Sequence, residues 1–178
     1  MHTLRRPAMI PHPNCYFLTP QFLAGEYPGA KSRAAARDKL SAILDAGVTA
    51  FFDLTEADEL MPYEELLYEL ATEREAAVQY ERFPICDLQT PERPQQMVAI
   101  LDAIDEALAA GHTVYLHCWG GVGGTGTVVG CWLVRHGYSA DIALAHLGAH
   151  LATMQKAYRV PRSPETDDQV TYVRTWKE

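Results

Sequence analysis

Apolar residues recur at the three- and four-residue spacing of a helix face in several separate stretches of the chain. The clearest stretch is 96–110, where the apolar side chains share one face and Gly111 follows as a C-terminal stop. Near the end of the chain, Ser163, Pro164 and Glu165 predict the start of a last helix, because serine is a good N-cap and proline suits the first turn. The other predicted helices are 32–46, 62–77, 127–136 and 140–154.

Short apolar and aromatic runs between these helices predict buried strands. These runs are 16–18, 22–24, 49–54, 78–83 and 113–117. Because strands and helices alternate, we expect an α/β fold with a central, mostly parallel sheet flanked by helices. No repeat, low-complexity tract or linker divides the sequence, so a single domain over 1–178 is predicted. Residues 1–14 are rich in proline and are expected to form an extended N-terminal arm.

The composition narrows the class of protein. The net charge of −8 argues against sequence-independent nucleic-acid binding, which depends on lysine and arginine. The longest apolar runs fall short of a membrane span, and no export signal is recognisable. The four cysteines lack the spacing of a zinc site or a disulfide framework; they are Cys15, Cys86, Cys118 and Cys131. We therefore expect a cytoplasmic protein that needs no metal or other cofactor and has no nucleic-acid or membrane partner.

A glycine-dense segment follows the strand at 113–117 and leads into the helix at 127–136. It reads His117-Cys118-Trp119-Gly120-Gly121-Val122-Gly123-Gly124-Thr125-Gly126. So many glycines contribute nothing to packing, but they allow a backbone to curl with its N–H groups facing inward. Together with the following helix N-terminus, such a loop binds an anion of phosphate size. Cys118 opens the loop and should favour the thiolate form near neutral pH, which makes it a candidate nucleophile.

This loop resembles that of the protein tyrosine and dual-specificity phosphatases, which carry His-Cys-x5-Arg-Ser/Thr between a strand and a helix. The resemblance implies that His117 orients the loop, Cys118 attacks phosphorus and the Thr125 hydroxyl helps the thiolate leave. It also implies that the backbone of the intervening residues holds the phosphate; these are Trp119, Gly120, Gly121, Val122, Gly123 and Gly124.

The same family places a general acid on a loop roughly thirty residues before the cysteine. Asp87 lies 31 positions before Cys118, just after the predicted strand 78–83. An aspartate in a loop is ordinarily a turn or capping residue. The spacing, which played no part in finding the cysteine loop, favours Asp87 as the acid.

Gly124 departs from the family pattern, because the family has an arginine there. That arginine grips two phosphate oxygens with a planar fork, which no other side chain reproduces. Losing a preorganised charged donor of this kind costs roughly a thousandfold or more in rate. We therefore expect this chain to be an inactivated or severely impaired phosphatase, with a non-catalytic phosphate-binding protein as the main alternative.

Other interpretations of the same residues are weaker. The run 121–126 matches the G-x-G-x-x-G of dinucleotide-binding folds, with Asp141 at about the distance of their ribose-binding acid, but no strand is predicted to lead to that aspartate. A rhodanese-like loop would leave Asp87 unexplained. His146 and His150 have the spacing of metal ligands on a helix, but no third ligand is evident.

The substrate is less well defined than the class. The five residues between Cys118 and Gly124 are uncharged, which favours a substrate with one phosphate, such as phosphotyrosine or phosphoserine/threonine in a protein. The basic residues Lys156, Arg159 and Arg162 form either a solvated loop or a rim that attracts acidic substrates. The sequence leaves the oligomeric state open.

Overall fold

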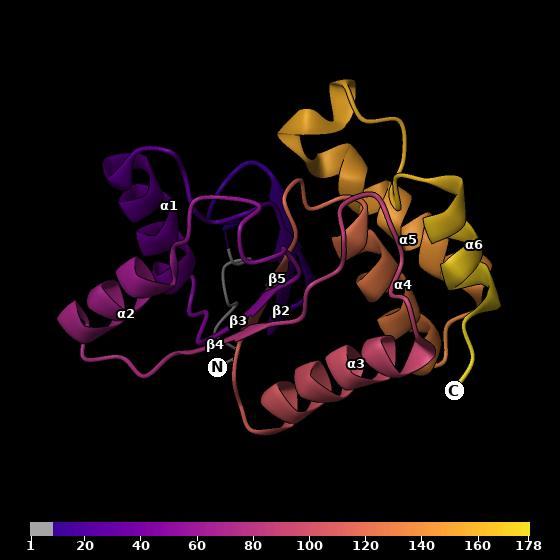
Figure 1. The fold of residues 1–178 in the computed structure, drawn as a ribbon, viewed down its shortest axis with the longest axis horizontal. Helices are drawn as coiled ribbons and strands as arrows, with labels where there is room; N and C mark the ends of the chain where they lie inside the picture. The colour runs from indigo at the N-terminus through magenta and orange to yellow at the C-terminus, as the bar shows by residue number, and fades with distance from the viewer. Residues whose placement is uncertain (1–8) are drawn as a thin grey trace, which may run out of the picture.

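The computed structural model describes residues 9–178, which are organised around one five-stranded sheet (Figure 1). The strands are β1 (Cys15–Thr19), β2 (Phe22–Gly25), β3 (Ala50–Asp53), β4 (Gln79–Arg82) and β5 (Val114–His117). Their order across the sheet is β1-β2-β5-β3-β4; β1 pairs antiparallel with β2, and the other pairings are parallel. The predicted α/β fold with a mostly parallel sheet is confirmed. Of the expected arm at 1–14, residues 1–8 lie outside the described residues.

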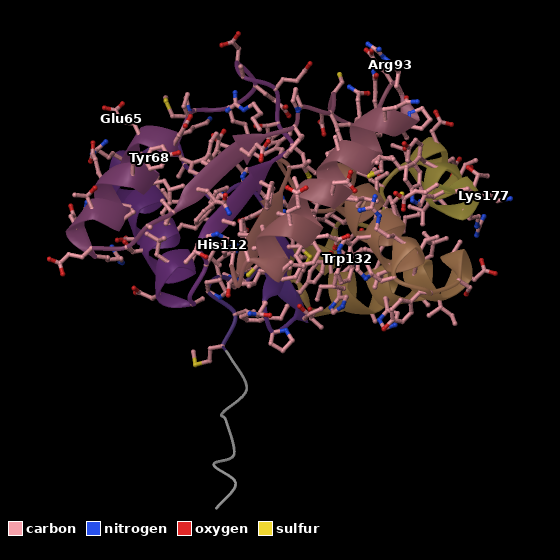
Figure 2. The ribbon with its side chains drawn as sticks, turned by 90° about the horizontal axis from the view of Figure 1, so that it is seen from below. Glu65, Tyr68, Arg93, His112, Trp132 and Lys177 are labelled. Carbon is pink, nitrogen blue, oxygen red and sulfur yellow. The ribbon has the colours of Figure 1, made fainter. Side chains whose placement is uncertain are left out.

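Helices cover both faces of the sheet (Figure 1). On one face lie α1 (Arg33–Asp45) and α2 (Glu64–Glu73); on the other lie α3 (Pro94–Ala109), α4 (Gly124–Arg135), α5 (Ala140–Thr153) and α6 (Asp167–Thr175), with the 3₁₀ helix η1 (Gln155–Tyr158) after α5. Alternate side chains of β5 enter the two layers, as strand geometry requires: Tyr115 packs with α1 and α2, and Val114 and Leu116 pack on the other face. In Figure 2, Tyr68 of α2 and Trp132 of α4 mark the two layers.

Helix α1 shows how the local sequence sets an element. The Ser32 hydroxyl accepts a hydrogen bond from the Ala35 N–H (3.0 Å), which satisfies a free donor of the first turn. Leu40 and Ile43 are fully buried on the face toward the sheet. Gly47 follows with φ +95°, a left-handed conformation that ends the helix at little cost.

Three helix boundaries differ from the prediction by three or more residues. Helix α2 ends before 77 because Glu75 adopts a left-handed φ of +52°. Helix α4 begins at Gly124, three residues early, inside the glycine-dense segment. Helix α6 begins at Asp167 with Thr166 as its cap, so the predicted start at 163–165 is wrong. Ser163 instead donates its hydroxyl to the Val122 carbonyl (2.9 Å), a tertiary contact that no local pattern reveals.

The parallel strands end together at one edge of the sheet. The register aligns Gly25 of β2, His117 of β5, Asp53 of β3 and Arg82 of β4 in a single row. The segments that follow these residues therefore emerge side by side. Open α/β sheets bind their ligands at this carboxyl edge, and here it carries the glycine-dense segment after β5 and the Asp87 segment after β4.

Candidate active site

The glycine loop (residues 118–124) curls around the Cys118 sulfur. The N–H of Gly121 points at that sulfur, with 3.3 Å between nitrogen and Sγ. Helix α4 starts at Gly124, so its N-terminal N–H groups and dipole face the same space. Cys118 is 9% exposed, which leaves its sulfur at the floor of an opening. The space above the sulfur is therefore lined by backbone N–H donors, an arrangement that binds anions in other proteins.

Close backbone approach explains two of the glycines. Gly121 has φ +75°, and a Cβ there would lie 2.4 Å from the carbonyl carbon of Gly25 and 2.6 Å from the nitrogen of Glu26. A Cβ on Gly123 would lie 3.1 Å from the amide atoms of Gln169. The loop is thus pressed between the end of β2 and the start of α6, so its shape depends on glycine at 121 and 123.

Side chains in the loop face different ways. Val122 is 3% exposed and packs into the core layer of α3 to α6, whereas Trp119 is 57% exposed. Thr125 is fully buried, and its Oγ1 has no hydrogen-bond partner among the described residues. A buried hydroxyl without a partner is costly unless a ligand or a reaction step uses it.

The side chain of His117 forms a hydrogen bond with the backbone of Cys118, the first residue of the glycine loop. Its side chain is fully buried, and burial lowers its pKa to about 4 even though the nearby Asp53 carboxylate acts to raise it. The ring is therefore neutral at pH 7. Nδ1 lies 3.2 Å from the Cys118 carbonyl, which can only accept, so Nδ1 carries the proton. Nε2 is then an acceptor for the hydroxyl of Tyr63 at 2.6 Å.

Asp53, which the sequence analysis did not identify, lies beside His117 at the carboxyl edge of the sheet. It is fully buried, and one of its oxygens accepts from the Thr55 N–H (2.8 Å) and hydroxyl (2.6 Å). Its other oxygen accepts from the Tyr80 hydroxyl (2.7 Å) and from Arg82 (3.4 Å). These partners satisfy a carboxylate that would be expensive to bury alone, and they tie β3 to β4 beneath the site.

Asp87 and Cys118 line one narrow cleft. Gly124, Thr55 and Glu59 line it too, with Leu54, Ile85, Cys86 and Leu88 completing the walls. Asp87 itself is exposed. Partial burial raises the pKa of Glu59, and the negative charge of Asp87 adds to the rise. Asp87 and Cys118, which the sequence analysis related only by their separation along the chain, thus line the same cleft.

A Cβ fits at the position where the family carries its arginine. A Cβ on Gly124 would lie 3.5 Å from Cys118 Cβ and 4.0 Å from its sulfur, which are ordinary contacts. None of the described residues lining the cleft is a lysine or arginine, and two are acidic. The site as it stands therefore offers an anion backbone N–H groups but no cationic side chain.

The C-terminal segment contributes residues that sequence reasoning missed or misplaced. Lys156 is 6% exposed and bonds the Gly120 carbonyl, so the hypothesis of a basic rim fails for this lysine. Gln169, fully buried, donates to the Gln89 carbonyl (3.2 Å), which ties α6 to the segment after Asp87. No local signal marks these contacts, because each joins segments far apart in the chain.

The competing interpretations lose their structural basis. Asp141 lies in the first turn of α5, and no strand follows the glycine loop in residues 124–178, so a dinucleotide-binding unit is absent there. His146 packs against Tyr138, and His150 stacks on Tyr16 (ring centroids 4.3 Å apart). Within residues 9–178, no group of three or more metal-ligating side chains is assembled, and no helix has the length and apolar character to cross a membrane.

A strand–loop–helix unit whose cysteine accepts a backbone N–H, with an aspartate lining the same cleft, is typical of the class of cysteine-dependent phosphatases. The family model Tc-R-P, described as "Polymorphic toxin system, DSP-PTPase phosphatase", matches residues 25–138. The chain belongs to this family of dual-specificity and tyrosine phosphatases.

Individual relatives agree with that assignment. A protein of Invertebrate iridescent virus 3 that is named as a tyrosine phosphatase is 28% identical over 123 residues, covering 66% of this chain. The match spans only 44% of that viral protein. The crystal structure of Tk-PTP in the active form is 25% identical with a TM-score of 0.69, covering 90% of this chain and 94% of that one. The structure of TpbA from P. aeruginosa is 16% identical and shares the fold, with a TM-score of 0.68 over 96% of this chain and 89% of that one.

Proposed function

We propose that this site is built to hydrolyse phosphomonoesters through a cysteinyl-phosphate intermediate. The observation that carries the proposal is the shared cleft: Cys118, Asp87 and Gly124 line it together. A nucleophile, a proton donor and an anion cradle are the three parts that this chemistry requires.

In the first step the Cys118 thiolate attacks phosphorus and forms a P–S bond while the P–O bond to the leaving group breaks. Asp87, in its protonated form, gives its proton to the leaving oxygen. The inward N–H groups of the glycine loop stabilise the charge on the remaining phosphoryl oxygens. The geometry at Gly121 supports this step, because an N–H that points at the sulfur favours the thiolate.

In the second step water attacks the phosphoryl group and the P–S bond breaks. Asp87, now a carboxylate, takes a proton from the attacking water, and inorganic phosphate leaves. The Thr125 hydroxyl donates to the departing thiolate. Its burial without a hydrogen-bond partner among the described residues supports this role.

We further propose that Gly124 leaves this chain severely impaired. Without an arginine there, no charged fork meets the phosphoryl oxygens, and Glu59 and Asp87 make the cleft acidic. The expected loss is about a thousandfold in rate, or about 4 kcal/mol of transition-state stabilisation.

The test is turnover of p-nitrophenyl phosphate and of a phosphotyrosine peptide by this chain and by its Gly124→Arg form, with Gly124→Arg/Cys118→Ser as the control for contaminating activity. We expect Gly124→Arg to raise kcat/KM by about a thousandfold, and the control to abolish the gain. Equal rates for the chain and Gly124→Arg would contradict the role of Gly124. An inactive Gly124→Arg that folds normally would contradict the proposed reaction itself.

The substrate we propose is a single phosphate on a protein tyrosine, serine or threonine. The loop residues between Cys118 and Gly124 carry no charge with which to meet additional phosphates. Comparing phosphopeptides with inositol phosphates as substrates of the Gly124→Arg form tests this point. Preference for the multiply phosphorylated compounds would refute it.

A non-catalytic phosphate-binding role is the second candidate, and Gly124 is the observation that favours it. It predicts micromolar binding of a phosphopeptide by this chain without turnover. An impaired enzyme that lacks its arginine should instead bind the same peptide far more weakly than Gly124→Arg does. Titration calorimetry with both forms separates the two roles.

A further inference from the structure

Most carbonyl groups of the glycine loop accept a hydrogen bond from a donor outside the loop. A carbonyl turned outward matters because the peptide unit is planar and trans, so the N–H of the next residue points the opposite way, into the loop. The carbonyl–donor pairs are Trp119 with the Tyr27 N–H (2.9 Å), Gly120 with Lys156 Nζ (2.6 Å), Val122 with Ser163 Oγ (2.9 Å) and Gly123 with Thr127 Oγ1 (2.8 Å).

The peptide unit between Gly120 and Gly121 is distinctive, because both its carbonyl oxygen and its N–H form hydrogen bonds to side chains. Lys156 Nζ donates to its carbonyl oxygen at 2.6 Å, and its N–H points at Cys118 Sγ with 3.3 Å between nitrogen and sulfur. Gly121 has a left-handed φ, and its backbone packs closely against that of Gly25. The Lys156 donor on the outside, together with this packing, therefore fixes the direction of the N–H on the inside.

Lys156 is itself held in place. Its side chain is 6% exposed, and its ammonium also contacts a Glu26 oxygen at 2.8 Å. The other Glu26 oxygen binds Lys39 at 2.7 Å, and the backbone N–H of Lys156 bonds the Asn14 side chain at 3.0 Å. Partial burial acts to raise the pKa of Glu26, but the hydrogen bonds from the two lysines outweigh it and hold that pKa below its usual range. One carboxylate between two ammonium groups leaves a net positive charge behind the loop.

We propose that Lys156 is a positioning residue of the active site: through the peptide unit between Gly120 and Gly121 it directs an N–H at Cys118 and keeps the sulfur in its thiolate form. This inference rests on the proposed role of Cys118 as the nucleophile. The positive charge of Lys156 polarises the Gly120 carbonyl. This makes the Gly121 N–H, at the other end of the same peptide unit, a stronger hydrogen-bond donor. Lys156 does not touch the substrate, because it lies on the outer side of the loop.

The test measures the rate at which iodoacetamide alkylates Cys118 as a function of pH in this chain, followed by mass spectrometry of the Cys118 peptide. Lys156→Met removes the donor and the charge, and Lys156→Gln removes only the charge. Arg159→Met is the matched control, because Arg159 is an exposed cation in the neighbouring turn. Urea denaturation of each variant checks that it is folded.

Both Lys156 variants should move the pH midpoint of alkylation upward, by about one unit for Lys156→Met, which is a tenfold fall in thiolate at a pH below the midpoint. Arg159→Met should leave the midpoint within about 0.3 unit, since exposed charges are screened. The variants leave the other ionisable groups around the sulfur in place; these are Glu59, Asp87 and Cys86 along the cleft, and Tyr16 and Tyr115 beneath it.

A folded Lys156→Met or Lys156→Gln protein with an unchanged midpoint would overturn the proposal, as would an equal shift in Arg159→Met. If Lys156→Met does not fold, Lys156→Gln decides alone. In the Gly124→Arg form, Lys156→Met should lower kcat/KM about tenfold at a pH below the midpoint and leave kcat/KM nearly unchanged above the shifted midpoint. Because alkylation needs no turnover, a failure of the phosphatase proposal would show separately, as an inactive Gly124→Arg form.

Discussion

Replacing Tyr63 by phenylalanine removes one hydroxyl from beneath the glycine loop and leaves the ring in place. That hydroxyl lies 2.6 Å from Nε2 of His117, and both side chains are buried, at 2% and 0% exposure. Because His117 is neutral and carries its proton on Nδ1, Nε2 is left as a buried acceptor without its donor. A buried group that loses its partner costs about 1–3 kcal/mol of unfolding free energy.

The assay is urea denaturation, with Tyr68→Phe as the control. Tyr68 lies on α2, the helix for which Tyr63 is the N-cap (Figure 2). It is 41% exposed, so its substitution should change stability by less than about 0.5 kcal/mol. For a chain of this size, a loss of about 2 kcal/mol corresponds to a fall in Tm of roughly 4–8 °C. If Tyr63→Phe were as stable as Tyr68→Phe, the proposed orientation of His117 would be wrong.

Two further predictions concern stability. The pKa of His117 falls from 6.5 to about 4 on folding, so the unfolded chain binds more protons between these values and stability must decrease as the pH falls through this window. Burial lowers the pKa of His12 to about 4 as well, so urea denaturation should give a loss of about 2 kcal/mol from each of these two histidines between pH 7 and pH 5; unchanged stability at pH 5 would contradict their neutral burial. Gly121→Ala should lose about 2 kcal/mol or more, because its Cβ would meet the Gly25 backbone at 2.4 Å, whereas Gly124→Ala should be neutral or gain up to about 1 kcal/mol. Thermal melting of the two alanine variants checks the contrast, and equal melting temperatures would count against it.

The sequence identifies the residues proposed for the reaction because the signals that mark them are local. Cys118 and the glycines lie in one continuous run, and Asp87 lies 31 positions before Cys118. A motif and a spacing are therefore enough to identify them as candidate site residues. The fold class follows from the alternation of apolar runs. What the motif cannot provide is the start of α4: glycine normally disfavours a helix, yet Gly124 is helical because the loop must close there.

The supporting residues are hidden from sequence reasoning for a physical reason. Lys156 and Gly120 are separated by 36 positions, and nothing near Lys156 distinguishes a buried lysine from a solvated one. Ser163 illustrates the same limit. Its sequence context predicts a helix cap, but its hydroxyl donates a hydrogen bond to the Val122 carbonyl. In both cases a tertiary hydrogen bond takes precedence over the local preference.

These supporting contacts also explain why Gly124 can alter the chemistry without altering the fold. The loop is shaped by glycine where the backbone is crowded, at Gly121, and by outside donors such as Lys156 and Ser163. Position 124 has neither of these roles: it is partly buried, and a Cβ there would meet only Cys118, at ordinary contact distance. An arginine at 124 would therefore act chiefly on the bound anion. If Gly124 impairs the reaction as proposed, a single substitution at this position should be enough to separate a folded protein from an active one, because the cleft is assembled without the arginine.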